Sequence, residues 1–267
     1  MIKPEKRVRP IQPYMRTDTI NYREEDYLQH GISHFYTFEC REHQVLRIVP
    51  DGCMDLVFVY TREGMTSYVR GTTTEFRKQI LSGIRQVFGV KFLPGVHPAL
   101  IKVHMGEMPD RYTEMEDVLR GDKKWLSDMG KRMDFEQCIK VFLQAYLMAE
   151  NKAEMPYGKR AIAMTIKGLI YATDGKIKIG DIAGQTGYSE RYVHKVFRKE
   201  MGFSPKIFCK IIQFQRILEY LGDSEPDKIV DIAIEYGYYD QPQLNRDFRR
   251  YAGMTPKRYA RWMCLRD

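Results

Sequence analysis

The sequence lacks long apolar runs. Stretches such as residues 57–60 are far shorter than the about 18 residues that a membrane span needs. No apolar segment follows the basic start at residues 1–7, so we expect no secretory signal. The five cysteines are odd in number and none has a neighbour at metal-ligand spacing, which excludes a zinc ribbon and favours reduced thiols. These absences predict a cytoplasmic protein without membrane, metal or other cofactor.

Positive charge is unevenly distributed along the chain. Its 267 residues include 43 Lys and Arg against 35 Asp and Glu, for a net charge of +8. Residues 159–267 contain 20 basic and 13 acidic residues, whereas residues 1–158 contain 23 and 22. A nearly neutral half joined to a basic half indicates one module that faces a polyanion and one with another task. A merely solvated basic surface is the alternative.

A polar stretch at residues 151–158, which includes Pro156 and Gly158, is the predicted linker between two domains. Before it, short runs rich in aromatic and β-branched residues predict strands at 32–40, 45–49, 54–60, 67–70 and 86–92. Strands at this spacing indicate a sandwich or barrel. Residues 134–148 then change to a helical period. That helix packs against its own domain or against a partner, which leaves dimerisation open.

The basic half contains an internal repeat. Residues 179–183 match residues 229–233 at an offset of 50, and Gly187-Tyr188 matches Gly237-Tyr238 at the same offset. One extra residue near Tyr239 moves the offset to 51, at which Phe197, Gly202 and Pro205 match Phe248, Gly253 and Pro256. Two copies are too few for a solenoid. They predict a tandem pair of small modules.

Each copy has the pattern of helix, glycine turn, helix. Gly187 supplies the first turn, and Ser189 is a suitable N-cap for the helix that follows. In the second copy Asp240 is the cap and Pro242 lies in the first turn, where its missing N–H costs nothing. Residues 206–221 are apolar on several sides and predict a helix that packs on both modules, with Gly222 as its cap.

The second helix of each copy has a polar face at helical spacing. In a helix-turn-helix, such a face enters a major groove and offers side chains to base edges. The alternative for either helix alone is an ordinary solvated face. Two copies inside the basic half favour DNA. The polar faces consist of Arg191, His194, Lys195 and Arg198 in the first copy and Pro242, Asn245, Arg246 and Arg249 in the second.

Residues 159–264 resemble the DNA-binding domain of the AraC/XylS-type (arabinose-regulator) transcription factors. The motifs that carry the resemblance are Gly187-Tyr188-Ser189, Gly202-Phe203-Ser204-Pro205, Asp231-Ile232-Ala233, Gly237-Tyr238 and Gly253-Met254-Thr255-Pro256. The resemblance implies seven helices and two helix-turn-helix motifs that bind successive major grooves of duplex DNA. It implies base contacts by Arg191, His194, Lys195, Gln241, Gln243, Asn245 and Arg246. Phosphate contacts are expected from Ser189, Arg198, Lys206, Asp240, Arg249, Lys257 and Arg258.

Residues 49–58 and 89–100 are similar to a sensor-type domain that precedes this DNA-binding domain in some family members. The expected fold class is therefore α+β with two domains. A β-rich, cupin-like domain ending in helices occupies residues 1–150, and an all-α domain with two helix-turn-helix motifs joined by a long helix occupies residues 159–267. The first domain is expected to bind a small-molecule effector, a partner or a second copy, and the whole chain to act with RNA polymerase as a bacterial-type transcription regulator or activator.

Four residues of the first domain are candidates for effector binding: Asp51, Cys53, Asp55 and His97. Alternation in a strand would place the first three on one face, although Asp51-Gly52 is also an ordinary turn signal. No His-x-His pair is present, so no metal is expected and the chain is not expected to be an enzyme. Two alternatives remain: a cupin-like, metal-dependent enzyme tethered to DNA, and a regulator that needs no ligand.

Overall fold

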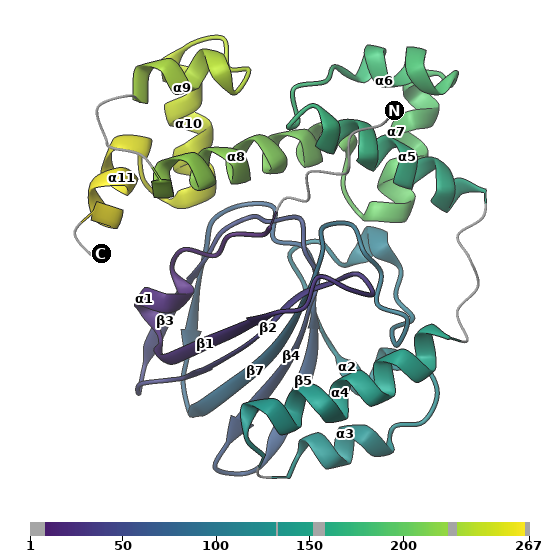
Figure 1. The fold of residues 1–267 in the computed structure, drawn as a ribbon, viewed down its shortest axis with the longest axis vertical. Helices are drawn as coiled ribbons and strands as arrows, with labels where there is room; N and C mark the ends of the chain where they lie inside the picture. Colours follow the sequence, from purple (N-terminus) through teal and green to yellow (C-terminus); the bar gives the residue numbers. More distant parts are fainter. Residues whose placement is uncertain (1–8, 132, 152–157, 224–228, 265–267) are drawn as a thin grey trace.

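The computed structural model describes residues 9–131, 133–151, 158–223 and 229–264. The first half of the chain forms a β-rich part, and the second half forms a helical part that lies across one end of the sheets (Figure 1). This confirms the expected α+β fold class with an all-α second half. Residues 152–157 of the expected linker lie outside the described residues, so the domain boundary stays a prediction.

The β-rich part contains two sheets, in which every strand pairing is antiparallel. The large sheet has the order β1-β2-β7-β4-β5-β8, and the small one pairs β3 with β6. The elements of this part are α1 (Met15–Asp18), β1 (Ile20–Asp26), β2 (Ile32–Glu39), β3 (Gln44–Ile48), β4 (Asp55–Thr61), β5 (Met65–Arg70), β6 (Arg77–Leu81), β7 (Ile84–Phe92), the short 3-10 helix η1 (Met105–Glu107), β8 (Tyr112–Glu114), α2 (Met115–Val118), α3 (Lys124–Met129) and α4 (Phe135–Glu150).

Side chains of the large sheet alternate between two environments, because successive residues of a strand point to opposite faces. Phe35 and Phe58 belong to the cluster beneath α3 and α4, where the Phe35 ring lies 6.0 Å from that of Phe142. Their neighbours Tyr36 and Val57 belong to the cluster between the two sheets. Of the predicted sandwich or barrel, the structure has two sheets with a shared core, and helices cover the outer face of the large sheet (Figure 1).

The buried face of helix α4 packs against its own domain, and dimerisation stays a prediction. The Asp134 carboxylate accepts a hydrogen bond from the Gln137 backbone N–H at 2.8 Å, and the Gln137 side chain accepts one from the Asp134 N–H at 3.0 Å. This capping box fixes where the helix starts. The buried stripe beneath it consists of Phe135, Cys138, Ile139, Phe142 and Tyr146.

The helical part has seven helices within the described residues, as the resemblance implied. Helices α6 and α7 form one helix-turn-helix and α9 and α10 the other, with α8 between them (Figure 1). The helices are α5 (Lys159–Ala172), α6 (Ile179–Thr186), α7 (Glu190–Met201), α8 (Pro205–Asp223), α9 (Ile229–Glu235), α10 (Gln241–Ala252) and α11 (Pro256–Cys264). None of them, nor any other described helix, is long and apolar enough to cross a membrane.

Helix α8 belongs to the cores of both modules. Phe208 and Ile212 pack in the cluster of the first module, and Phe214 and Ile217 in that of the second. This confirms the expected packing. The expectation that Gly222 caps the helix is wrong, since α8 continues to residue 223.

Three strands were not predicted from the sequence: β1, β6 and β8. β1 is rich in charged residues, and its burial alternates only between half-buried and exposed. It lies at the edge of the large sheet, where polar side chains are tolerated.

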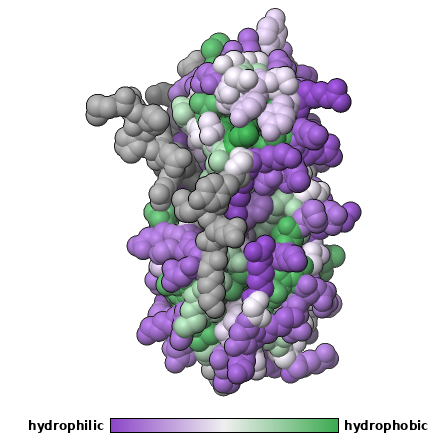
Figure 2. All heavy atoms as spheres, turned by 90° about the vertical axis from the view of Figure 1, so that its right-hand side faces the viewer, coloured by the Kyte–Doolittle hydropathy of each residue, from purple (hydrophilic) through white to green (hydrophobic). Residues whose placement is uncertain are grey.

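The right-hand side of Figure 1 is drawn in Figure 2, where hydrophilic side chains cover most of the surface and hydrophobic ones form small separate areas.

Candidate functional site

Helix α7 of the first module presents a basic face to solvent. The Ser189 hydroxyl caps it by accepting a hydrogen bond from the Tyr192 N–H at 3.3 Å, and Gly187 ends the preceding helix in the left-handed region at φ 73°. Val193, Val196 and Phe197 are buried beneath the helix. The opposite face exposes Arg191, Lys195 and Arg198, with His194 half-buried beside them.

Helix α10 of the second module repeats this arrangement. It begins at Gln241, and the Asp240 carboxylate accepts a hydrogen bond from the Gln243 N–H at 2.7 Å. Pro242 therefore lies in the first turn, as predicted. Leu244 and Phe248 face the core. The residues on the outer face are Gln241, Arg246 and Arg249, which are exposed, and Asn245, which is half-buried.

Two residues that are predicted to contact DNA also make capping hydrogen bonds at the start of α10. The Gln243 side-chain oxygen accepts a hydrogen bond from the Tyr239 N–H at 3.0 Å, so this oxygen is already occupied while its amide nitrogen can still donate. The Asp240 carboxylate is both a cap and an anion, and it can approach a phosphate only through its backbone. Lys206, at the start of α8, and Lys257 and Arg258, at the start of α11, are exposed.

The β-rich part contacts α7 and α10, the second helices of the two modules, at their C-terminal ends. These two are called the reading helices below. Gly202, which ends α7 at φ 87°, has no room for a Cβ because the Met105 carbonyl of η1 occupies that space. At Gly253, the equivalent residue of α10, a Cβ would lie 2.7 Å from the Phe76 ring. The Phe76 N–H also donates to the Arg250 carbonyl at 3.1 Å. Both helices therefore keep their N-terminal halves exposed, which are the halves that read bases in this motif.

Residues 11–14 join the two halves of the chain. Tyr14 is fully buried in the core of the second module, and its hydroxyl donates to the Ala252 carbonyl at 2.8 Å. The side chain of Gln215, in α8, accepts from the Ile11 N–H at 2.7 Å and donates to the Pro50 carbonyl at 2.8 Å. A buried glutamine with both ends satisfied in this way fixes the contact geometry.

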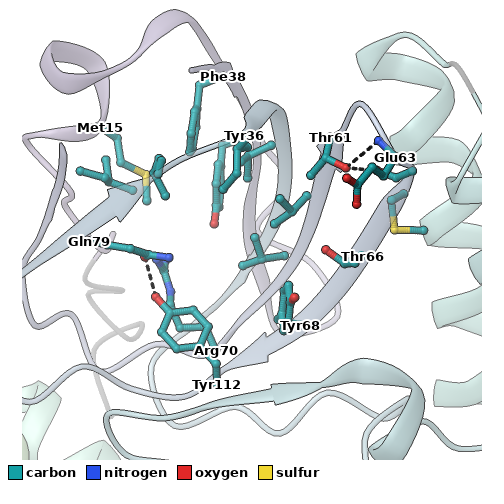
Figure 3. Close-up of a pocket in the computed structure, with 18 residues that line it drawn as sticks. Met15, Tyr36, Phe38, Thr61, Glu63, Thr66, Tyr68, Arg70, Gln79 and Tyr112 are labelled. Atoms are coloured by element: carbon teal, nitrogen blue, oxygen red, sulfur yellow. Dashed lines mark hydrogen bonds between the residues drawn. The ribbon is translucent and has the colours of Figure 1, made fainter. Parts of the chain in front are cut away.

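A cavity of about 560 Å³ lies between the two sheets. Figure 3 shows Gln79, Arg70 and Tyr112 together on one side of it, and Thr61 and Glu63 on another. The Tyr112 hydroxyl donates to the Gln79 side-chain oxygen at 2.7 Å. The apolar part of the wall includes Met15, Phe38, Leu46, Val57, Leu81 and Val87. A mostly apolar wall with a few polar groups is typical of a small-molecule site.

A row of buried charged residues crosses the large sheet beside this cavity. Asp55 on β4 lies directly opposite Arg70 on β5 and Lys91 on β7, and cross-strand neighbours of this kind interact directly. The Lys91 ammonium lies 2.8 Å from one Asp55 oxygen and 2.7 Å from Asp51, while Arg70 pairs with the other Asp55 oxygen. Burial acts to raise the pKa of Asp51, but the charge of Lys91 and the hydrogen bonds from Lys91, Gln12 and Cys53 together hold that pKa below its usual value of 3.8. Each of the four side chains lies within ion-pair distance of a residue of opposite charge in the row.

The four residues predicted to bind an effector are not among those lining the cavity. Asp51 and Asp55 belong to the charged row. Cys53 is buried, and burial raises the pKa of its thiol well above 9.0. His97 lies at the contact with α7, where its Nε2 is 2.5 Å from the Glu200 carbonyl oxygen. Within the residues that the structure describes, no group of three or more His, Cys, Asp or Glu could hold a metal ion.

The His97 contact is expected to weaken in acid. Burial lowers the pKa of His97 from 6.5 to about 4, and the nearby charges of Arg160 and Lys167 act in the same direction. The released imidazole binds a proton more readily than the docked one, so the contact is fully stabilising above pH 6.5 and loses stability as the pH falls from there toward about 4. Hydrogen exchange of the amides of residues 198–202, corrected for intrinsic rates, should quicken across that range.

A variant that cannot be protonated provides the control. His97→Gln should remove the pH dependence at residues 198–202. The amides of β2 report instead on the buried His34, whose pKa is lowered to about 3 by burial. Equal acceleration at residues 198–202 in the wild-type protein and the variant would contradict the role assigned to His97.

Sequence reasoning missed Arg70, Lys91 and Gln215. The only available signal was a charged residue inside an otherwise apolar strand, as at Arg70 and Lys91. For Gln215 the signal was a glutamine in an apolar helix. Neither signal identifies the residue with which the buried polar side chain pairs.

Comparison with known families divides the chain as the structure does. A family model described as a helix-turn-helix domain matches residues 182–261. A second model, a domain of unknown function (DUF6597), matches residues 22–114. The first match covers both reading helices, and the second covers the strands around the cavity.

Curated relatives are regulators of transcription. The probable transcription factor PqrA of Proteus vulgaris is 31% identical over 85 residues, which are 31% of this chain and 67% of PqrA. The transcriptional activator AarP of Providencia stuartii is 28% identical over 86 residues, 32% of this chain and 62% of AarP. The uncharacterised regulator YbfP of Bacillus subtilis is 25% identical over 107 residues, 40% of this chain but 36% of YbfP. The chain thus spans about a third of YbfP and three fifths of AarP.

Among solved structures, the crystal structure of ToxT from Vibrio cholerae O395 aligns with a TM-score of 0.44 and 10% identity. The alignment covers 88% of this chain and 99% of that one. It is a remote likeness of fold.

Proposed function

The chain belongs to the AraC/XylS-type transcription regulators, and from this premise we propose that it binds duplex DNA sequence-specifically and thereby regulates transcription. Helices α7 and α10 enter two successive major grooves. The observation that carries the proposal is the duplicated, outward-facing basic face of these helices, with Arg191 and Lys195 exposed on one and Arg246 and Arg249 on the other. Arg and Lys donate to guanine O6 and N7 in the major groove.

Base contacts are proposed for Arg191, His194, Lys195, Gln241, Gln243, Asn245 and Arg246. Phosphate contacts are proposed for Ser189, Arg198, Lys206, Asp240, Arg249, Lys257 and Arg258. Both helix N-termini also offer backbone N–H groups, which favour phosphate. In this arrangement α8 sets the separation of the two reading helices, because it contributes to both module cores.

The test is selection of bound duplexes from a random DNA pool with the full chain at a stated salt concentration. Enrichment of two short motifs about 10 base pairs apart, one helical turn, supports tandem major-groove reading. Enrichment of one motif alone would restrict reading to one module. If no sequence is enriched, the proposal of sequence-specific binding fails.

Single changes at Lys206 and Lys257 test the proposed phosphate contacts. We expect Lys206→Ala and Lys257→Ala each to weaken binding to every sequence alike and to reduce the slope of log K against log salt by about 1. The measurement is Kd for the selected duplex and for a scrambled one at several salt concentrations. A change in sequence preference would show instead that these lysines read bases.

We also propose that a small-molecule effector occupies the cavity between the sheets. The support is its size, its apolar wall and the polar side chains of Arg70, Gln79 and Tyr112 on one side. Asp51 and Asp55 then influence effector binding indirectly, through Arg70. His97 influences DNA binding through its contact with α7. Cys53 lies in the buried turn that contains Asp51, and its N–H donates to the Asp51 carboxylate at 3.0 Å.

RNA polymerase and a second copy of the chain complete the proposed partners. A transcription regulator changes the output of polymerase, so contact with it follows from the proposed activity. Self-association is supported by α4, where Met148 is 59% exposed and lines, with Val141, a groove of about 520 Å³ against α3. Sedimentation of the wild-type protein and of Met148→Lys measures it.

A further inference from the structure

A series of polar contacts, buried at its cavity end, runs from the cavity wall through Gln12 and the backbone of residues 11 and 50 to helix α8. Arg70 lines the cavity and pairs with Asp55. Asp55 lies 2.8 Å from Lys91, and Lys91 lies 2.7 Å from Asp51. These residues are 1–7% exposed. A contact in such a dry environment is strong, and it cannot be replaced by water when one member moves.

The series continues through Gln12 into the contact between the two halves. The Gln12 amide donates to Asp51 at 2.7 Å and to the Val49 carbonyl at 2.7 Å. Gln215 of α8 is hydrogen-bonded to Ile11, the neighbour of Gln12, and to Pro50, the neighbour of Asp51. The residue that ends the series therefore lies on the helix that joins the two DNA-reading modules.

The charges of this series restrict what the cavity accepts. Two carboxylates, one ammonium and one guanidinium balance each other, and Glu63 at the cavity rim adds a further negative charge. An anionic ligand at Arg70 would lie close to the buried Asp55 carboxylate, which pairs with the same guanidinium, and two carboxylates this close in a dry environment repel each other strongly. An uncharged ligand with a hydrogen-bond acceptor avoids this repulsion and can still bind Arg70, because a guanidinium has five N–H donors.

We propose that the cavity binds an uncharged, largely apolar ligand whose acceptor group contacts Arg70. When the ligand binds, the Arg70–Asp55–Lys91–Asp51–Gln12 series couples the filled cavity to Gln215, and thereby changes the DNA affinity of helices α7 and α10. This rests on the proposed DNA-binding function and adds to it the ligand class and the route of regulation. Because linkage is reciprocal, the ligand changes DNA affinity by the same factor by which DNA changes ligand affinity.

Two fluorescent probes with the same ring system test the ligand class in the full chain. One is 6-propionyl-2-(dimethylamino)naphthalene, which is uncharged and has a carbonyl acceptor. The other is 6-(dimethylamino)-2-naphthoate, which has a carboxylate in its place. We expect the ketone to bind at least about tenfold more tightly at neutral pH, since a buried hydrogen bond and a mismatched charge each change affinity by such factors. Arg70→Met should weaken binding of the ketone, because it removes the proposed hydrogen-bond donor. Equal or tighter binding of the carboxylate, or no binding of the ketone, overturns the proposal.

The route is tested by titrating the ketone with and without saturating selected duplex. We expect DNA to change the ketone Kd by about fivefold or more, within the usual range of coupling between sites. In Gln215→Met, which keeps the size of the side chain, the factor should fall to about one. Gln12→Met provides a second variant with the same expected result.

Glu75→Gln is the matched control. Glu75 pairs with Arg250 at 2.6 Å in the same interface but outside the series, so this variant should keep the wild-type factor. An unchanged factor in both Gln215→Met and Gln12→Met, or an equal loss in Glu75→Gln, overturns the route. If the wild-type chain binds no duplex, the proposed function fails instead, while the probe comparison still decides the ligand class.

Discussion

Replacing Arg191 and Arg246 together by alanine is expected to abolish sequence-specific DNA binding. Arg191 lies in the first turn of α7, and Arg246 lies on the outer face of α10. Both side chains are exposed. A bidentate contact to guanine contributes about 1–3 kcal/mol, so the loss of one such contact in each groove should raise Kd by about 30-fold or more. Electrophoretic mobility shift or anisotropy titrations with the selected duplex measure this.

A double variant with the same loss of charge serves as the control. Lys124→Ala with Lys140→Ala removes two exposed positive charges from α3 and α4, outside the helical part. It should alter Kd only by the weak, salt-dependent effect of net charge. Each single arginine variant should relax preference in one half of the site alone. An unaltered affinity of the Arg191→Ala, Arg246→Ala protein for its selected duplex would refute the assigned reading faces.

Lys91→Met is expected to destabilise the β-rich part strongly. The Lys91 side chain is 1% exposed and neutralises both Asp51 and Asp55. Its removal leaves Asp51 without its cation and Asp55 with Arg70 alone, and breaking a buried ion pair in this way costs about 3–5 kcal/mol. The free energy of unfolding from urea titrations, followed by circular dichroism, measures the loss.

The pH dependence of that loss distinguishes charge from packing. In the wild-type protein the pKa of Asp51 is held below 3.8, so its contribution is present above that pH and is lost as the pH falls below it. The variant should therefore lose more stability at neutral pH than in strong acid. Arg23→Met, which breaks an exposed pair with Glu136, should cost less than about 1 kcal/mol. If the two variants cost the same, the buried row does not have the stabilising role assigned to it.

The helix-turn-helix modules were predictable because their signals are local. Ser189 and Asp240 cap helices from positions immediately before them, and Gly187 and Gly253 adopt the left-handed backbone that glycine favours. The one-residue shift in the repeat near Tyr239 corresponds to a turn in which Tyr239 is 92% exposed. Caps, turns and helical period all act within a few residues, so the chain specifies them before it folds.

Strand register decides which residues surround Asp55, one of the four predicted effector residues. Asp55 and Lys91 are 36 residues apart, and only the pairing of β4 with β7 brings them face to face. A shift of one residue would turn either side chain to the opposite face of the sheet. Residues 51–54 precede β4, which begins at Asp55, so strand alternation does not apply to Asp51 and could not show that Lys91 and Arg70 pair with the two carboxylates.

The sequence by itself determined the two modules, the basic faces of α7 and α10, the helix between them and the β-rich character of the first half, because hydrophobic period and capping residues act locally. Only the tertiary structure decided that Tyr14 enters the second module, that η1 and Phe76 contact the ends of both reading helices, and that a charged row leads from a cavity to Gln215. Those contacts join residues as many as 238 positions apart. Their geometry depends on how whole elements pack, for which a single sequence has no local signal.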